Sequence, residues 1–242
     1  MIHLSDALEY LSQIESRKYR LAYVDPPFNT GKVQRGRAGS YTDSLGESFI
    51  PWLTDLMAQI HRTITDDGSV FIHLDWREVH RAKVLVMDEI FGATSFMNEI
   101  IWAYDYGARS RKKWSTKHDS ILWYVKDPKN YVFNFEEMDR IPYMAPGLVG
   151  PEKAARGKTP TDVWWHTIVP TNGKERTGYP TQKPLGILNR ILKVHSLPGD
   201  QVLDPCAGSG SFGEAALALG RFPTLVDSNP EAIAVMEQRL KR

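Results

Sequence analysis

Two aspartates in this chain each stand directly before a proline, at the end of an apolar run. Asp25 lies in YVDPPFNTG and is followed by two prolines and Phe28, whereas Asp204 lies in QVLDPCAGSGSFG. A carboxylate accepts hydrogen bonds from an amine, and an aromatic ring offers a face on which a flat ring can stack. Pro26 and Pro27 have a fixed φ and no N–H, so they hold the Pro26 carbonyl in place. The first motif therefore predicts a place where a flat, amine-bearing group is bound.

The second motif is a glycine loop between a predicted strand and a predicted helix. Gly208, Gly210 and Gly213 satisfy the G-x-G-x-x-G pattern, and Asp227 ends the next predicted strand near the spacing at which a dinucleotide fold binds ribose. Asp204 stands directly before the loop, where a carboxylate repels a pyrophosphate and attracts a cationic amine. The motif therefore favours a nucleoside cofactor with a cationic amino-acid end and no phosphate, which describes S-adenosylmethionine.

Strands and helices alternate along the chain, which predicts an α/β fold with a mostly parallel sheet. We expect strands at 2–4, 20–25, 69–75, 96–104, 201–204 and 222–227, with a further antiparallel pair at 119–126 and 131–135. We expect helices at 5–16, 48–65, 77–91, 185–195, 212–219 and after Asn229, with Ser5 and Asn229 as caps. The segments 29–47 and 136–178 are expected to be loops. Because the chain ends soon after Asp227, the remaining strands of the sheet must come from the N-terminal half.

Composition limits the class of protein. A length of 242 residues fits one large α/β domain, and 42% hydrophobic with 24% charged residues is ordinary for a soluble protein. We expect no membrane span and a cytoplasmic location, since no long apolar run and no basic leader are present. The single cysteine, Cys206, excludes an internal disulfide, and the histidines and carboxylates lack metal-ligand spacing, so no metal is expected.

Three motifs in their order along the chain resemble a known family. DPPF at 25–28, YPTQKP at 179–184 and DPCAGSGSFGEAA at 204–216 are similar to the permuted β-group of DNA amino-methyltransferases, in which the catalytic motif precedes the cofactor loop. DDGSVFIHLD, MDEIFG, FMNEIIW and KHDSILWYVK further resemble modification subunits of Type III restriction systems and short solitary methyltransferases. The resemblance covers nearly the whole chain except about 136–172.

The resemblance implies one Rossmann-like, S-adenosylmethionine-dependent methyltransferase domain over residues 1–242, with a circularly permuted motif order and an antiparallel hairpin at the edge of the sheet. Residues 136–172 form a small variable insertion in this reading, and they are the candidate target-recognition region. The partner is double-stranded DNA. Some members of the family pair as homodimers, and we expect a homodimer here.

The chemistry requires the target nucleotide to leave the duplex, because an exocyclic amine inside a base pair cannot reach a methyl donor. Phe28 is then expected to stack on the base, while Asp25 and the Pro26 carbonyl each accept one N–H. The predicted catalytic residues are Asp25, Pro26, Pro27 and Phe28. An Asp before the two prolines is associated in this family mostly with adenine N6 and a Ser with cytosine N4, so adenine is favoured and cytosine stays open.

The resemblance also implies the cofactor contacts. Asp204, Gly208 and Gly210 line the methionine end and Asp227 holds the ribose. Three further groups complete the pocket: Asp6 and Ala7 near the adenine of the cofactor, Pro205 in the glycine loop, and Gln182, Lys183 and Pro184 from the preceding segment. Two of these aspartates have a purely structural alternative, Asp6 as a carboxylate at a helix start and Asp227 as a helix cap.

Net charge is only +1, so a nucleic-acid partner has to be met by local clusters of positive charge. Two such clusters flank the proposed base pocket along the chain, and we predict that they contact DNA phosphates. They comprise Lys32, Arg35 and Arg37 in the first, and Arg109, Arg111, Lys112 and Lys113 in the second. The alternative is that each is a solvated loop.

Two other functions stay open on the sequence alone. A methyltransferase of RNA or of protein glutamine also places a two-proline motif beside an amine or amide, but the permuted order and the basic loops argue against it. A non-catalytic DNA-binding subunit would keep the fold without the chemistry, and intact Asp25, Phe28, Asp204 and Asp227 argue against that.

Overall fold

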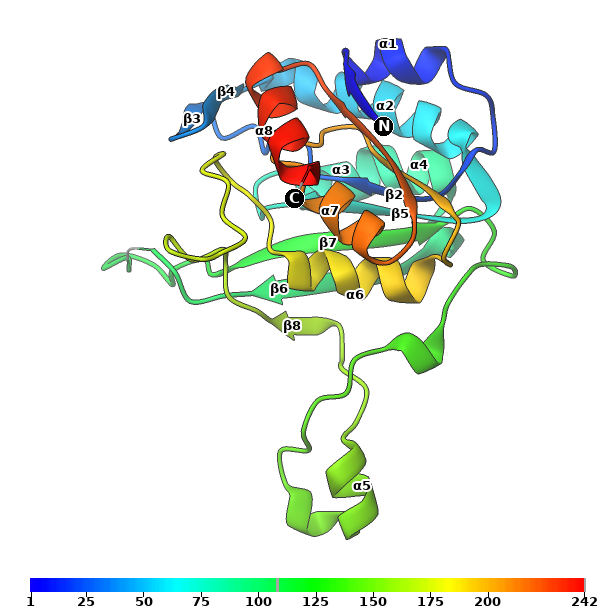
Figure 1. The fold of residues 1–242 in the computed structure, drawn as a ribbon, viewed down its shortest axis with the longest axis vertical. Coiled ribbons are helices and arrows are strands. Elements are labelled where there is room, and N and C mark those ends of the chain that lie inside the picture. Colours follow the sequence, from blue (N-terminus) through cyan, green and yellow to red (C-terminus); the bar gives the residue numbers. More distant parts are fainter. Residues whose placement is uncertain (108, 242) are drawn as a thin grey trace.

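The computed structural model describes residues 1–107 and 109–241. Among these residues, the main sheet has eight strands in the order β1-β10-β9-β2-β5-β7-β6-β8 (Figure 1). Their bounds are β1 Ile2–Leu4, β2 Tyr19–Val24, β5 Ile64–Leu74, β6 Phe96–Ala103, β7 His118–Val125, β8 Val163–Trp165, β9 Gln201–Asp204 and β10 Phe222–Asp227.

Five neighbouring strands, β1, β10, β9, β2 and β5, run parallel. β7 runs antiparallel to both β5 and β6, and β8 returns parallel to β6. The expected mostly parallel sheet with antiparallel pairing is therefore confirmed, but the hairpin consists of β6 and β7, and the short β8 lies outside it at the edge of the sheet. The N-terminal strand pairs with the last strand, as the permuted motif order requires: the Leu225 N–H donates to the carbonyl of Met1 at 2.8 Å.

Helices cover both faces of the sheet. Successive side chains of a central strand point to opposite faces, and both faces are apolar and need to be buried. Leu21 and Tyr23 of β2 pack with one set of helices, whereas Ala22 and Val24 pack with the other. The first face carries α6 (Leu185–His195), α7 (Ser211–Ala218) and α8 (Pro230–Leu240), and the second carries α1 (Ala7–Ser12), α2 (Phe49–Thr63), α3 (Val79–Ala82) and α4 (Asp88–Phe91).

Three local expectations were wrong. Asp6 rather than Ser5 caps α1, because its Oδ1 accepts the N–H groups of Leu8 at 2.8 Å and Glu9 at 3.2 Å. The helix expected over 77–91 is interrupted by a π-helical turn, Lys83–Met87, between α3 and α4. Residues 131–135 are not a strand; β7 pairs with β5 and β6 instead.

The segment 29–47 is not a structureless loop. It contains a two-stranded hairpin, β3 (Lys32–Gly36) and β4 (Gly39–Asp43). The hairpin contacts a segment that is distant in the sequence. The Ala38 N–H donates to the Gly178 carbonyl at 3.2 Å, and a Cβ on Gly36 would lie 2.3 Å from the same oxygen. Only glycine at position 36 allows this close approach.

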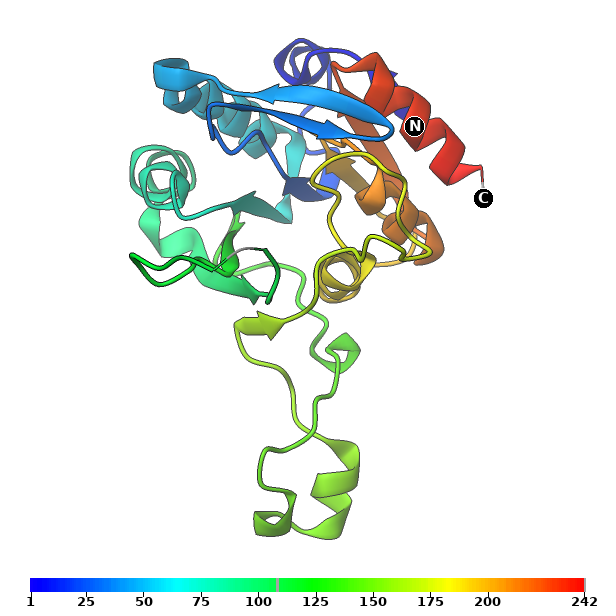
Figure 2. The same ribbon diagram turned by 90° about the vertical axis from the view of Figure 1, so that its left-hand side faces the viewer.

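The expected insertion divides into two parts. β8 and the residues after it join the main body, whereas the residues around α5 (Pro151–Arg156) form an arm that extends away from it (Figures 1 and 2). The base of the arm is held by a bridge between Ile141 and Lys158, and by Arg190 Nε donating to Asp139 Oδ2 at 2.8 Å. Among the described residues, none of the helices has the length and apolar character that a membrane span needs.

Candidate active site

Asp25 and Asp204 lie at the same edge of the sheet, where two paired parallel strands end. β2 and β9 are neighbours in register, with Leu21 opposite Val202 and Ala22 opposite Leu203. Both aspartates line one cavity of about 350 Å³, a volume within the range of small-molecule sites, ~300–1,000 Å³. The two motifs that are far apart in the sequence therefore open onto one shared space.

Most of the predicted catalytic and cofactor residues line this cavity. They are Asp6, Ala7, Asp25, Pro26, Pro27, Phe28, Gln182, Lys183, Asp204, Pro205, Gly208 and Asp227. Two predicted residues are not among its lining. Pro184 stands at the N-cap position of α6, and Gly210 faces α8, where a Cβ would lie 2.7 Å from Met236 Cγ.

Asp227 holds the glycine loop in shape. Its Oδ2 accepts the Gly208 N–H and its Oδ1 accepts the Asn229 N–H, both at 2.8 Å. Asn229 in turn caps α8 through its side chain, as expected, so Asp227 itself is not the cap. Tyr179 closes the loop from the other side, because a Cβ at Gly208 would lie 3.4 Å from its ring.

The carboxylates give the cavity a strong preference for cations. Burial raises the pKa of Asp204 well above its usual value, and the nearby charges of Asp25 and Asp227 raise it further. Burial also raises the pKa of Asp227. Binding of a cation next to these groups removes their mutual repulsion and favours the ionised form. An ammonium and a sulfonium, the two cations of S-adenosylmethionine, fit this lining better than a phosphate does.

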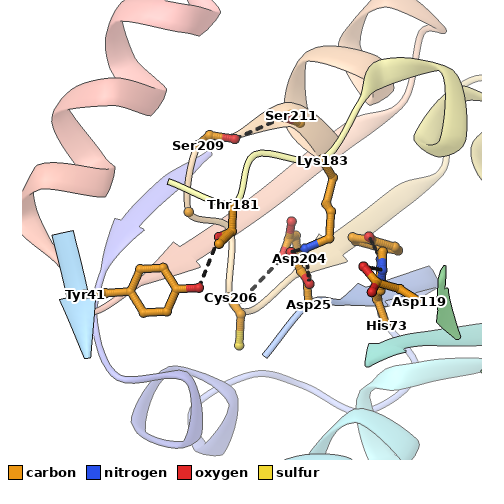
Figure 3. Close-up of polar contacts among 12 residues, drawn as sticks. Asp25, Tyr41, His73, Asp119, Thr181, Lys183, Asp204, Cys206, Ser209 and Ser211 are labelled. Atoms are coloured by element: carbon orange, nitrogen blue, oxygen red, sulfur yellow. Dashed lines mark hydrogen bonds and ion pairs between the residues drawn. The ribbon is translucent and has the colours of Figure 1, made fainter. Parts of the chain in front are cut away.

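Lys183 lies between the two motifs, not only beside the cofactor. Its Nζ donates to Oδ1 and Oδ2 of Asp25 at 2.6 and 2.5 Å, and it lies 4.9 Å from the centroid of the Phe28 ring. Figure 3 shows the lysine reaching down toward Asp25 and Asp204. The sequence placed Lys183 in the cofactor pocket, and the structure also makes it the ion-pair partner of the predicted catalytic carboxylate.

Asn29 fixes the end of the first motif, and sequence reasoning missed it. The residue has a left-handed φ of 56°, which asparagine tolerates better than most residues. Its Oδ1 accepts the N–H groups of Leu45 at 2.9 Å and Gly46 at 2.8 Å, and its Nδ2 donates to Glu78 at 2.9 Å. These contacts set the direction in which the chain leaves Phe28. An asparagine directly after an aromatic at a strand end was the available signal.

A second cavity, of about 800 Å³, shares Phe28 and Lys183 with the first. Its other walls include Trp102 and Tyr104, and the carboxylate of Asp119. Phe28 and Lys183 are thus among the residues that stand between the two cavities, of which the smaller is lined by five carboxylates and the larger by two, Asp75 and Asp119. The larger cavity can accept a flat ring against Phe28.

A buried histidine supports the wall of the larger cavity. The Tyr23 hydroxyl and His73 Nδ1 are 2.7 Å apart. His73 Nε2 and Asp119 Oδ2 are 3.2 Å apart (Figure 3). The Tyr104 hydroxyl donates to Asp119 Oδ1 at 3.0 Å. Burial alone raises the pKa of Asp119, but the contacts with His73 and Tyr104 and the charge of Lys183 lower it overall. Asp119 is therefore an ionised acceptor in this wall.

The predicted phosphate contacts are all exposed and come from two protrusions beside the cavities. The β3–β4 hairpin carries Lys32, Arg35 and Arg37, and Arg35 also lines the larger cavity. The loop between β6 and β7 carries Arg109, Arg111, Lys112 and Lys113, of which Arg109 pairs with Asp105 at 3.1 Å. Both protrusions extend on the same side of the molecule (Figure 1). Within the described part of the chain, no three His, Cys, Asp or Glu side chains are grouped to hold a metal ion.

Comparisons with known proteins show the family to which the chain belongs. A family model described as DNA methylase, of the N6/N4 class, matches residues 19–238. The DNA adenine methyltransferase YhdJ of Escherichia coli K12 is 32% identical, over 99% of this chain and 82% of the relative. The Type II methyltransferase M.ScaI of Streptomyces caespitosus is 28% identical, over 100% of this chain and 81% of the relative.

Two solved structures share the fold. The PvuII DNA methyltransferase, which is cytosine-N4-specific, superposes with a TM-score of 0.74 and 16% identity, over 98% of this chain and 85% of that one. The complex of M1.HpyAVI with S-adenosylmethionine superposes with a TM-score of 0.66 and 21% identity, over 100% and 99%. The chain therefore belongs to the N6/N4 DNA methylase family and is an S-adenosylmethionine-dependent DNA methyltransferase that acts on an exocyclic base amine.

Proposed function

We propose that this enzyme methylates the N6 amine of adenine in double-stranded DNA. The observation that carries the proposal is the shared cavity, in which Asp25 and Asp204 meet with Phe28 at its rim. The adenine preference is supported by Asp25 before the two prolines and by the adenine methyltransferase among the relatives.

The target adenine leaves the duplex and enters the larger cavity, where Phe28 stacks on its ring. An aryl amine is a poor nucleophile because its lone pair is delocalised into the ring. Asp25 and the Pro26 carbonyl each accept one N–H, which draws the nitrogen toward tetrahedral geometry and frees the lone pair. Asp25 is then the nearest base for the proton that the methylated nitrogen must lose.

The smaller cavity holds the cofactor in this proposal, and S-adenosylmethionine supplies a methyl group activated by its sulfonium. Asp204 and Gly208 bind the methionine end of the cofactor, and Asp227 binds its ribose hydroxyls. Asp6 and Ala7 lie beside the adenine ring of the cofactor. Asp6 has two roles in this proposal, because its Oδ1 also caps α1. Gly210 acts through packing, since its close contact with Met236 seats α8 against the glycine loop.

The test is the identity of the methylated product. Tritiated S-adenosylmethionine is incubated with unmethylated duplex DNA, the DNA is digested, and the labelled nucleoside is separated. Label in N6-methyladenine is expected. Label in N4-methylcytosine would instead support the cytosine alternative, which the PvuII neighbour represents. Methylation-sensitive sequencing of DNA from cells that express the chain reports base and sequence context together.

The arm within 136–172 is the proposed target-recognition region, because it extends away from the main body (Figure 2). Met144 and Leu148 on the arm are strongly exposed apolar side chains. We also propose a homodimer, which the resemblance favours and such exposed apolar groups allow. Sedimentation that finds monomers alone, with and without DNA, would remove the dimer.

Replacing Lys183 with Met is expected to lower kcat about tenfold and to leave cofactor affinity within about threefold. The ammonium holds both oxygens of Asp25, and hydrogen bonds to charged groups contribute about 1.5–3 kcal/mol each, so its loss releases the carboxylate from its working position. Single-turnover kinetics and cofactor titration measure the two effects separately.

Lys183→Arg is the matched variant, and it is expected to recover part of kcat because it restores a cation beside Asp25. The opposite pattern, weaker cofactor binding with unchanged kcat, would show that Lys183 serves only the cofactor pocket.

A further inference from the structure

The loop 104–117 lies at the edge of the sheet that carries the active site. β5 ends with Leu74 opposite Ser120, and β6 ends with Ala103 opposite His118, so the connection between β6 and β7 stands at the edge where β2 and β9 also end. Tyr104 and Tyr106 line the larger cavity. This loop is therefore placed to meet whatever DNA surrounds a base in that cavity.

Hydrogen bonds hold the described part of the loop in one shape. The Ser110 N–H donates to Ser115 Oγ at 2.7 Å, and Ser110 Oγ accepts the N–H groups of Lys112 and Lys113 at 3.1 and 3.2 Å. Lys113 Nζ also lies 5.0 Å from the ring centroid of Trp76, in the turn after β5. The tip of the loop is thus held by its own hydrogen bonds, and Lys113 contacts a residue in the turn that follows β5.

This closed tip presents Trp114 to solvent. The side chain is 97% exposed, more than any other aromatic among the described residues. A fully exposed indole is unusual in a protein surface, and here it directly follows Arg111, Lys112 and Lys113. A surface that combines cations with a bare aromatic face is complementary to nucleic acid, which offers phosphates outside and stacked rings inside.

We propose that Trp114 inserts into the duplex beside the target nucleotide and stacks on the bases that the flipped base leaves. The inference rests on the proposed function, since an enzyme that did not extrude its target base would need no such group. Apolar side chains that enter a base step replace part of the lost stacking and hold the opened duplex. The three cations hold the phosphates on either side, and Phe28 receives the extruded base in the cavity.

The test compares matched and mismatched duplexes that contain the site methylated by the wild-type enzyme. Trp114→Ala is expected to lower kcat/KM about tenfold or more on the matched duplex, since stacking on one base accounts for a factor of this size. On a duplex with a mismatch at the target base, extrusion is already easier. The defect there is expected to shrink to about threefold or less, and Trp114→Phe is expected to keep most activity on both.

Phe222→Ala is the control, because Phe222 is an exposed aromatic at the start of β10, the opposite edge of the sheet. Fluorescence of 2-aminopurine at the target position reports extrusion directly and is expected to fall in Trp114→Ala. Full activity of Trp114→Ala on matched DNA, or an equal loss on both duplexes, would overturn the inference while the proposed function stood. Transfer of the methyl group to cytosine rather than adenine by the wild type would instead remove the proposed function.

Discussion

Asp25→Ala is expected to lower turnover about 1,000-fold while S-adenosylmethionine binds with nearly unchanged affinity. In the proposed mechanism the carboxylate is both the acceptor that localises the lone pair of the target amine and the base for its proton, so one substitution removes both effects. General base catalysis alone contributes about 100- to 10,000-fold, which sets the scale of the loss. Single-turnover methylation of DNA, with cofactor titration on the same preparation, checks both halves of the prediction.

Asp25→Asn separates the two effects, because the amide oxygen still accepts an N–H but cannot take a proton. We expect it to retain slightly more activity than Asp25→Ala. Asp66→Asn is a matched control: Asp66 also pairs with a cation, Arg17 at 3.1 Å, but is largely exposed near the start of β5. If Asp25→Ala kept more than about a tenth of wild-type turnover, the carboxylate would not act on the amine as proposed.

The meeting of Asp25 and Asp204 could be predicted because parallel strands present their carboxyl ends at one edge of a sheet. Each motif ends a recognisable apolar run. Because β2 and β9 pair directly, the two motifs come next to each other in the structure. The buried strands and the amphipathic helices α2 and α6 were predictable for a different reason. Their apolar spacing matches the period of the element they form.

The hairpin over 32–43 could not be read from apolar periodicity because its inner face carries the polar side chains of Gln34 and Asp43 beside Tyr41, while the outer face is exposed. Its position depends on contacts with residues around Gly178, far away in the sequence. The opposite error occurred at 131–135, where apolar alternation predicted a strand. Phe133 instead stacks on Trp123, with ring centroids 5.7 Å apart, and lies beside His195 at the end of α6. An aromatic cluster satisfied the pattern without a sheet.

Side-chain partners within the site were the least predictable part. Lys183 was assigned to the cofactor because of its place in the YPTQKP motif, and nothing local indicates that its ammonium reaches Asp25. Gly210 was assigned to the cofactor because it fits a fingerprint, yet its missing Cβ makes room for Met236. A short motif specifies backbone shape well, but it leaves open which neighbour needs that shape.

Asp227→Ala is expected to weaken S-adenosylmethionine binding about 100-fold and to leave kcat at saturating cofactor nearly unchanged. In the proposed site two ribose hydroxyls donate to the ionised carboxylate, and such hydrogen bonds contribute about 1.5–3 kcal/mol each. The substitution also removes the acceptor of the Gly208 N–H in the glycine loop and of the Asn229 N–H at the start of α8. Since burial raises the pKa of Asp227, wild-type affinity is expected to rise with pH until this carboxyl is ionised, and the variant to lose that part of the dependence.

Asp227→Asn distinguishes ribose binding from support of the loop, because the amide oxygen can still accept one backbone N–H. Calorimetric titration of the three proteins across pH 5–8, with melting temperatures measured without cofactor, separates the contributions. We expect Asp227→Asn to melt near the wild-type temperature and to bind with intermediate affinity, since a neutral acceptor forms weaker hydrogen bonds than a carboxylate. Affinity of Asp227→Ala within about threefold of wild type would mean that the ribose is held elsewhere in the cavity.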